Sequence, residues 1–157
     1  MDDLTKYESI VELTKFREHP WEFQSTFETP LKNLDLFVKT ILTSIPSPQS
    51  ATFIIDSVVF EPRNLIRLLA GHSLPDGFER GTCLMTAGFT ETENLLRVSL
   101  SDWIDFLFLP DPPTIAIYAD HDEFMTLYGH EHSTLDGVVA ALLEQGFKLQ
   151  RDYRRHF

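Results

Sequence analysis

Apolar residues in the first part of the chain recur at helical spacing, and this pattern predicts two amphipathic helices. The first spans residues 4–16 and stops before Pro20, because the residue preceding a proline is pushed out of the helical region. The second begins with Thr29 as its N-cap and Pro30 at the first helical position, and it ends before Pro46.

The segment between these helices, residues 21–27, is rich in aromatic side chains but too short for a third helix. We interpret it as a connector whose aromatic residues plug one end of the core. Two helices alone are too small to bury a core, whereas the full chain of 157 residues, 43% of them hydrophobic, is large enough for one. The helical pair 4–45 and the sheet-containing part 51–157 are therefore expected to form one domain.

Short strands and short helices are expected to alternate in the middle of the chain. β-branched and aromatic runs bounded by turn residues predict the strands, and Gly71 and Ser101 are interpreted as the C-cap of one helix and the N-cap of another. The predicted strands are 51–55, with an extension as far as 60 left open, 81–89 and 94–100, and the predicted helices are 62–70 and 101–107.

Two apolar runs near the end of the chain predict a β-hairpin. Residues 114–119 and 124–128 alternate as strands do, and they flank the short polar segment 120–123. The hairpin places this polar segment at its tip.

A helix is predicted directly after the hairpin. Ser133 and Asp136 resemble a capping box, and the helix ends at Gly146, where Phe147 can fold back as in a Schellman cap. Residues 147–153 are expected to return as a final strand, which completes a C-terminal β-hairpin–helix–strand unit.

These elements together predict a single α+β domain over residues 1–157. We expect an antiparallel or mixed sheet of about five to six strands with helices mainly on one face, because helices and sheets cover each other's apolar sides.

Charge is distributed unevenly along the chain. Residues 98–146 hold nine Asp or Glu and no Lys or Arg, and the formal net charge of the chain is −11. Nucleic-acid and anionic membrane surfaces are bound through clustered Lys and Arg, so we expect neither as a partner. The acidity indicates a basic protein partner, and the leading hypothesis is a non-catalytic binding protein with an inhibitor, immunity-type or adaptor role.

Cysteine usage and the N-terminus indicate a cytoplasmic protein. Cys83 is the only cysteine, which leaves no intramolecular disulfide and no thiolate zinc site. The first residues are acidic where a signal peptide is basic, and no apolar run approaches the roughly 20 residues that span a bilayer. The seven glycines form no nucleotide-binding motif, so no cofactor is expected.

The predicted hairpin tip is the leading candidate for a partner-binding site, because three carboxylates and one imidazole are concentrated there. An exposed turn neither excludes water nor shifts a carboxyl pKa, so partner contact is expected rather than catalysis. The alternative is that these residues are polar only because the turn is solvated, without any partner. Trp103 is interpreted either as an aromatic anchor of the interface or as a core side chain. The candidate set is Asp120, His121, Asp122, Glu123, Glu131 and Trp103.

His130 and His132 support a hypothesis from another class. With Glu131 between them they offer a sparse ligand set for a metal, and a small metal-assisted hydrolase is the runner-up function. At about 3.3 Å per residue, the second hairpin strand separates these histidines from the tip by roughly 20 Å, so one site cannot use both groups.

Cationic residues gather at the end of the sequence as Arg151, Arg154 and Arg155. They are expected either to pair with carboxylates of the same chain or to meet the acidic face of a second copy, which would produce a homodimer. A self-associating structural protein is the third functional hypothesis.

Overall fold

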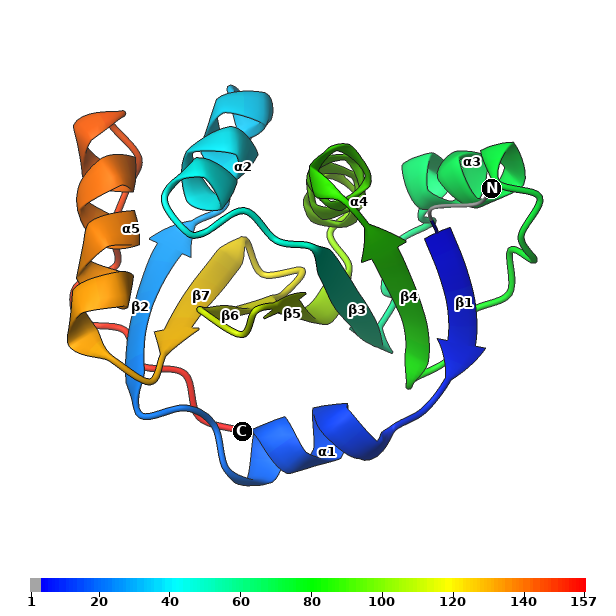
Figure 1. Cartoon of the computed structure of the whole chain (residues 1–157), viewed down its shortest axis with the longest axis horizontal. Helices are drawn as coiled ribbons and strands as arrows, with labels where there is room; N and C mark the ends of the chain where they lie inside the picture. Colours follow the sequence, from blue (N-terminus) through cyan, green and yellow to red (C-terminus); the bar gives the residue numbers. More distant parts are fainter. Residues whose placement is uncertain (1–3) are drawn as a thin grey trace.

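The computed structural model describes residues 4–157 as a seven-stranded antiparallel sheet with helices on both faces. The strand order is β1-β4-β3-β5-β6-β7-β2, so the first two strands of the chain lie at opposite edges of the sheet (Figure 1). The strands are β1 (Leu4–Glu8), β2 (Phe23–Glu28), β3 (Ser50–Ser57), β4 (Thr82–Ala87), β5 (Asp105–Asp111), β6 (Ala116–Ala119) and β7 (Phe124–Gly129).

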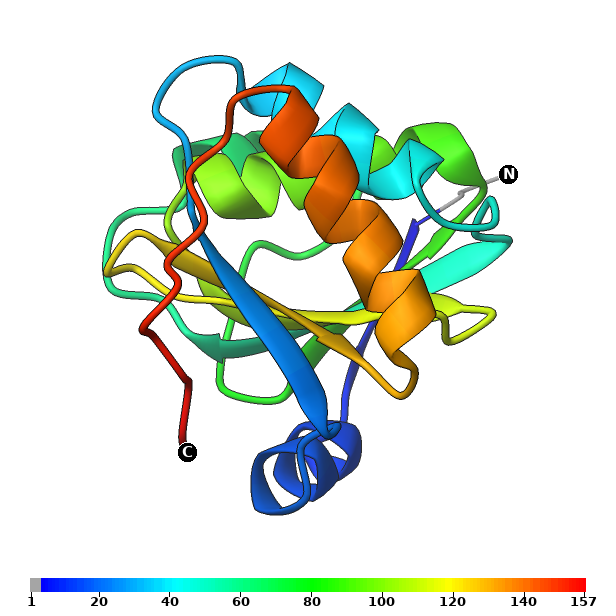
Figure 2. The same ribbon diagram turned by 90° about the vertical axis from the view of Figure 1, so that its left-hand side faces the viewer.

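Four helices cover one face of the sheet, and α1 lies on the other face, where it connects the two edge strands (Figure 1). After α5 the chain runs beside β2 and ends on the α1 side of the sheet (Figure 2). Among the described helices, none is long and apolar enough to cross a bilayer. The helices are α1 (Val11–Glu18), α2 (Leu34–Thr43), α3 (Arg63–Gly71), α4 (Phe89–Ser101) and α5 (His132–Glu144).

The larger core lies between the sheet and the four helices. Side chains of a strand alternate between the two faces, so every second residue of a central strand points toward the helices. Phe53 of β3 packs against Phe106 and Phe108 of β5, with ring centroids 6.0 and 4.9 Å apart. From the helix side, Phe37 and Ile41 of α2 are fully buried in this core.

The opposite face carries a smaller and more polar layer. Leu13 and Phe16 of α1 pack on it, and the ring of Phe16 meets Tyr128 edge-on with 4.9 Å between the centroids. One row of side chains crosses all seven strands in register on this face: Tyr7, Cys83, Ile54, Leu107, Tyr118, Thr126 and Thr26.

The first part of the chain differs from the sequence-based prediction. Residues 4–8 form β1 and only 11–18 are helical, while 23–28, predicted as a connector, form the edge strand β2. A strand of five residues is too short for its alternation to be told from helical spacing, and its pairing with β4 is a long-range contact. The predicted helix over 4–16 is therefore wrong in its first half.

The second predicted helix is confirmed, but it starts later than expected. Asn33 has a left-handed φ of 63°, and α2 begins at Leu34. Thr29, predicted as the N-cap, is 3% exposed, and its backbone N–H donates to the Glu123 carbonyl at 2.8 Å. Pro30 thus belongs to a loop that is attached to the β6–β7 turn.

The segment after β4 was also predicted wrongly. Residues 94–100 lie within α4 rather than in a strand. The helix predicted over 101–107 is also wrong, because α4 ends at Ser101 and β5 begins at Asp105. Leu95, Leu96 and Leu100 follow helical spacing and are all buried on one side of α4. Residues 90–93, the polar stretch between the two predicted strands, lie at the start of this helix.

The remaining predictions hold in their main lines. The strands β3, β4, β6 and β7 and the helices α3 and α5 are confirmed, and the α+β fold with helices mainly on one face is confirmed with seven strands instead of five or six.

Phe147 N donates to the Leu142 carbonyl at 3.1 Å, as the predicted Schellman cap requires. The capping box is wrong, because Glu131 is the N-cap of α5 and makes no side-chain cap bond. The expected final strand is reduced to one bridge between Leu149 and Phe27.

Candidate functional site

The β6–β7 turn is shaped by the carboxylate of Asp120. Its Oδ1 accepts hydrogen bonds from the backbone N–H of Asp122 at 2.9 Å and of Phe124 at 3.2 Å. The backbone N–H of Asp120 donates to the Phe124 carbonyl at 3.0 Å, and Glu123 takes a left-handed φ of 74° to close the turn. Asp120 is thus an internal structural residue, and it is not a free charge of the tip.

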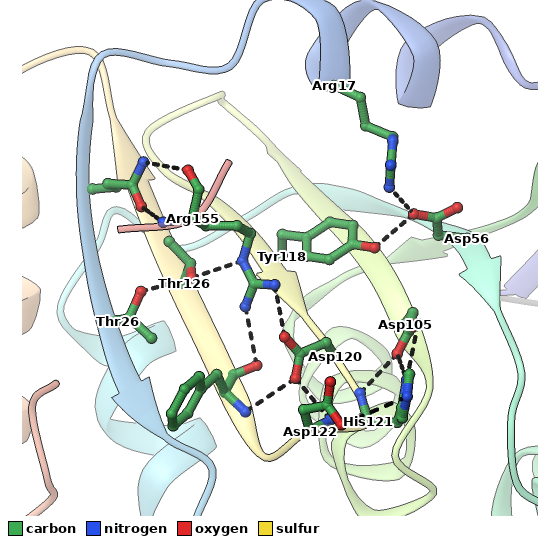
Figure 3. A network of polar contacts seen from close by, with 12 residues as sticks. Arg17, Thr26, Asp56, Asp105, Tyr118, Asp120, His121, Asp122, Thr126 and Arg155 are labelled. Atoms are coloured by element: carbon green, nitrogen blue, oxygen red, sulfur yellow. Dashed lines mark hydrogen bonds and ion pairs between the residues drawn. The ribbon is translucent and has the colours of Figure 1, made fainter. Parts of the chain in front are cut away.

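His121 is held by the buried carboxylate of Asp105, which begins β5 (Figure 3). The Asp105 Oδ1 accepts from the backbone N–H of His121 at 2.7 Å and from its Nδ1 at 2.9 Å. The hydrogen bond to Asp105 raises the pKa of His121, and the charges of Asp122 and Asp120 act in the same direction. The Asp105 pairing fixes the orientation of the imidazole ring, and its Nε2 is 3.7 Å from Asp122.

The imidazole forms part of a shallow hollow of about 350 Å³ at this end of the sheet. Three apolar or aromatic side chains and Glu123 provide the rest of its wall. Two of them are unusually exposed for their type: Leu31 is 79% exposed and Phe60 is 54% exposed. The ring centroids of Phe60 and His121 lie 6.4 Å apart in an edge-on arrangement. The hollow is lined by Leu31, Phe60, Trp103, His121 and Glu123, and we call these five residues together with Asp122 the tip surface.

Four loops contribute to the tip surface, and internal hydrogen bonds fix two of them besides the β6–β7 turn. The loop after β2 is attached to the turn through Thr29, as described above. Trp103 follows α4 with a φ of 56°, and the neighbouring Asp102 is buried. The Asp102 carboxylate accepts from the backbone N–H of Leu65 at 2.8 Å and from the Asn64 amide at 2.8 Å, which attaches this loop to the start of α3.

The structure brings only part of the predicted set together. Trp103 lies beside His121 and Glu123, so the predicted aromatic anchor and the predicted tip share one hollow. Asp122 is exposed, with 79% of its side-chain surface accessible. Glu131 lies at the other end of β7 and belongs to a different surface.

The two candidate metal ligands are engaged in ring contacts. His130 stacks on Trp21 with 3.9 Å between the centroids, and His132 lies against Phe23 with a centroid distance of 3.7 Å. Within residues 4–157 there is no group of three or more His, Cys, Asp or Glu side chains that could hold a metal ion. The metal-assisted hydrolase thus finds no support in the arrangement of these histidines.

The basic end of the chain is divided between the interior and the surface. Arg155 is 8% exposed, and its Nη1 is 2.7 Å from the Asp120 Oδ2. Arg151 and Arg154 are exposed. The expected pairing within the chain is therefore realised by Arg155, and a homodimer built on the same arginine would first have to break this ion pair.

A second polar cluster on the α1 face is centred on Asp56 of β3 (Figure 3). Its carboxylate accepts from the Tyr118 hydroxyl at 2.6 Å and from Arg80 Nε at 2.8 Å, and it also pairs with Arg17 of α1. Burial and the adjacent Asp56 raise the pKa of Tyr118. These contacts fix the Tyr118 ring and attach α1 to the sheet.

Comparison with known proteins adds no further assignment. The chain matches no protein-family model, no curated protein and no solved structure.

The tip surface could be anticipated only in part from the sequence. Leu31 and Phe60 were missed, because both lie in loops that approach the tip through sheet topology alone. A signal was present at Val59 and Phe60, two large apolar residues shortly before Pro62. The sequence predicts them only as a possible extension of the strand 51–55. Asp105 was also missed, because the segment that contains it was predicted to be a helix.

Proposed function

We propose that this chain is a non-catalytic binding protein that engages a basic protein partner, in an inhibitor, immunity-type or adaptor role. The observation that carries the proposal is the tip surface, where exposed apolar side chains surround a hollow with carboxylates at its rim. Aromatic anchors within a polar rim are the usual composition of a protein interface.

The charge of this surface supports a basic partner. Asp122 and Glu123 are exposed, and none of the five residues that line the hollow is a lysine or arginine. Lys32, which follows Leu31, is exposed but does not line the hollow. Such a surface accelerates the encounter with a positively charged partner and slows that with an acidic one.

The nine acids of residues 98–146 do not all contribute. Asp102, Asp105 and Asp120 are internal and hold loops or turns in place, whereas Asp136 and Glu144 are exposed on α5. The proposal is therefore confined to the tip surface, and the acidity of the rest of the chain has the general effect of keeping the protein soluble.

The test is capture of a basic protein from native extract by the immobilised chain at about 0.05 M and about 0.5 M salt. We expect a basic protein to be retained at low salt and released at high salt. The variant F60S/D122N/E123Q should lose this protein, because it removes the apolar anchor and two carboxylates without touching the core.

The matched control is V11S/D136N/E144Q, which makes the same kinds of change at exposed positions of α1 and α5. It should retain the partner as the unmodified chain does. Equal capture by both variants would show that the tip surface does not bind the protein, and capture that is insensitive to salt would contradict a partner held by charge.

A further inference from the structure

We propose that the pocket around Arg155 is a recognition site for an arginine of the basic partner, and that residues 151–157 occupy it in the absence of the partner. This rests on the proposed function, because it names the group by which a basic partner is held. The chemical class of the ligand is an arginine followed, two residues later, by an aromatic side chain.

The pocket satisfies the guanidinium group of Arg155 from several directions (Figure 3). Nη1 donates to the Asp120 carboxylate at 2.7 Å, Nε to the Thr126 hydroxyl at 3.0 Å, and Nη2 to the Phe124 carbonyl at 3.4 Å. The Thr126 hydroxyl is itself held by Thr26 at 2.7 Å. A carboxylate, a hydroxyl and a carbonyl each accept from a different nitrogen of this guanidinium, and the rigid fork of arginine fits such a set better than the compact ammonium of lysine.

An aromatic ring completes the pocket. The guanidinium carbon of Arg155 lies 4.9 Å from the centroid of Tyr118, within the range of a cation–π contact. Tyr118 is fixed by its hydrogen bond to Asp56, so the ring is in place independently of the arginine. The groups that hydrogen-bond the guanidinium belong to β7 and the β6–β7 turn and lie outside the 151–157 segment, while Tyr153 of the segment itself adds a second ring, with its centroid 5.7 Å from the guanidinium carbon.

The backbone around the arginine is recognised as well. The Gln24 Oε1 accepts from the Arg155 N–H at 2.7 Å, and its Nε2 donates to the Arg155 carbonyl at 3.2 Å. Two residues later Phe157 packs on Tyr118, with 4.9 Å between the centroids. The guanidinium carbon of Arg17 lies 4.8 Å from the centroid of the Phe157 ring. Recognition of main-chain groups together with two alternate side chains is a known mode of peptide binding.

The segment that fills the pocket combines exposed residues with side-chain contacts: Tyr153 packs on Phe124 with 4.8 Å between the centroids, and Arg154 donates to the Glu22 carbonyl at 3.4 Å. Residues 151–157 contain no helix or strand, and Arg151, Asp152, Arg154 and His156 are exposed. Because the segment belongs to the same chain, it is an internal ligand and acts at an effective concentration of about a millimolar or more. A free peptide competes poorly with it, whereas a partner that is already docked on the tip surface presents its arginine at a similar effective concentration.

The two sites are adjacent. Asp120 lies between them, since its Oδ1 shapes the turn that carries His121 and its Oδ2 binds Arg155 (Figure 3). A partner bound at the tip surface thus has the pocket within reach, and exchange of arginines replaces one buried ion pair by another.

The test uses the full chain with the substitution R155A, which removes the guanidinium from the pocket. The probe is the synthetic peptide acetyl-Arg-Asp-Tyr-Arg-Arg-His-Phe-amide, which copies residues 151–157, and binding is measured by isothermal titration calorimetry. We expect saturable binding of one peptide per chain. A peptide with lysine in place of the arginine that corresponds to Arg155 should bind about tenfold more weakly or worse.

Two further variants place the binding in the pocket. R155A/D120N should lose the peptide, and the unmodified chain should bind it at least about tenfold more weakly than R155A, since its own segment competes. Absence of saturable binding to R155A, or equal binding of the lysine peptide, would show that the contact serves only to hold the chain end.

The variant F157A keeps the measurement possible if R155A does not fold. It leaves the ion pair intact and loosens the segment, so the peptide should bind F157A more tightly than the unmodified chain. Equal affinity for the two proteins would overturn the exchange of segments. Peptide binding does not depend on capture of the native partner, so failure here with intact capture at the tip surface refutes this inference and leaves the proposed function standing.

Discussion

Asp120 and Arg155 are 35 positions apart in the sequence, yet their Oδ2 and Nη1 atoms are 2.7 Å apart and both side chains are largely buried. The same carboxylate shapes the β6–β7 turn through its other oxygen. One residue thus connects the turn with the end of the chain, and several consequences can be measured.

Removal of Arg155 should destabilise the fold strongly. R155A removes the cation that pairs with the buried Asp120 carboxylate, and breaking a buried pair from one side costs about 3–5 kcal/mol. R154A is the matched control, because Arg154 is exposed, and it should change the free energy of unfolding by about 0.5 kcal/mol or less. Urea unfolding followed by circular dichroism measures both, and similar losses in the two variants would contradict the role given to the ion pair.

Asp56 should control the attachment of α1. D56N replaces the carboxylate that pairs with Arg17 and Arg80 by a neutral amide, and we expect a loss of about 2–4 kcal/mol in the free energy of unfolding. The protection of α1 amides against hydrogen exchange should fall more than that of the amides of β3, because Asp56 holds α1 through Arg17, whereas β3 is hydrogen-bonded to a strand on each side. The control D136N changes an exposed acid on α5, and equal effects of the two substitutions would exclude a specific anchoring role.

The fold could be predicted best where the signals are local. The β6–β7 hairpin and α5 have turn residues and glycine caps at their ends, and their apolar periods are long enough to be unambiguous. The edge strands β1 and β2 have no such signals, because each is defined by pairing with a strand about 75 or 100 positions later in the chain. Their short apolar patterns fit a helix or a connector equally well.

The candidate site shows the same division. The turn residues 120–123 could be identified from their charge, but the exposure of each carboxylate depends on its partner. Asp120 is internal because Arg155 returns to it from the end of the chain, and His121 is fixed because β5 places Asp105 beside it. Neither contact leaves a pattern in the local sequence, so the charge at the tip was overestimated and the pocket was not foreseen.

Cys83 should be unreactive in the folded protein. It is 2% exposed, its thiol lies 3.3 Å from the Ser9 carbonyl, and burial raises its pKa. The thiolate is the species that reacts with iodoacetamide, so alkylation at pH 7.5 should be at least about a hundredfold slower in buffer than in denaturing urea. Mass spectrometry of the intact chain measures the modified fraction over time. Comparable rates in the two solvents would show that the β4 region opens readily or that the thiol is accessible.

His121 should make the stability of the protein depend on pH. Its pKa is raised in the folded state by the Asp105 carboxylate, so its contribution is fully present below the unfolded value of about 6.5 and is lost as the pH rises through the folded value. The difference in melting temperature between the unmodified chain and H121Q should therefore be largest at about pH 6 and should shrink above that pH. H19Q, a change at an exposed histidine of the loop after α1, is the control and should show no such trend. Nuclear magnetic resonance titration of the imidazole gives the direct check: the His121 midpoint should fall in D105N, and an unchanged midpoint would disprove the assignment of the shift to Asp105.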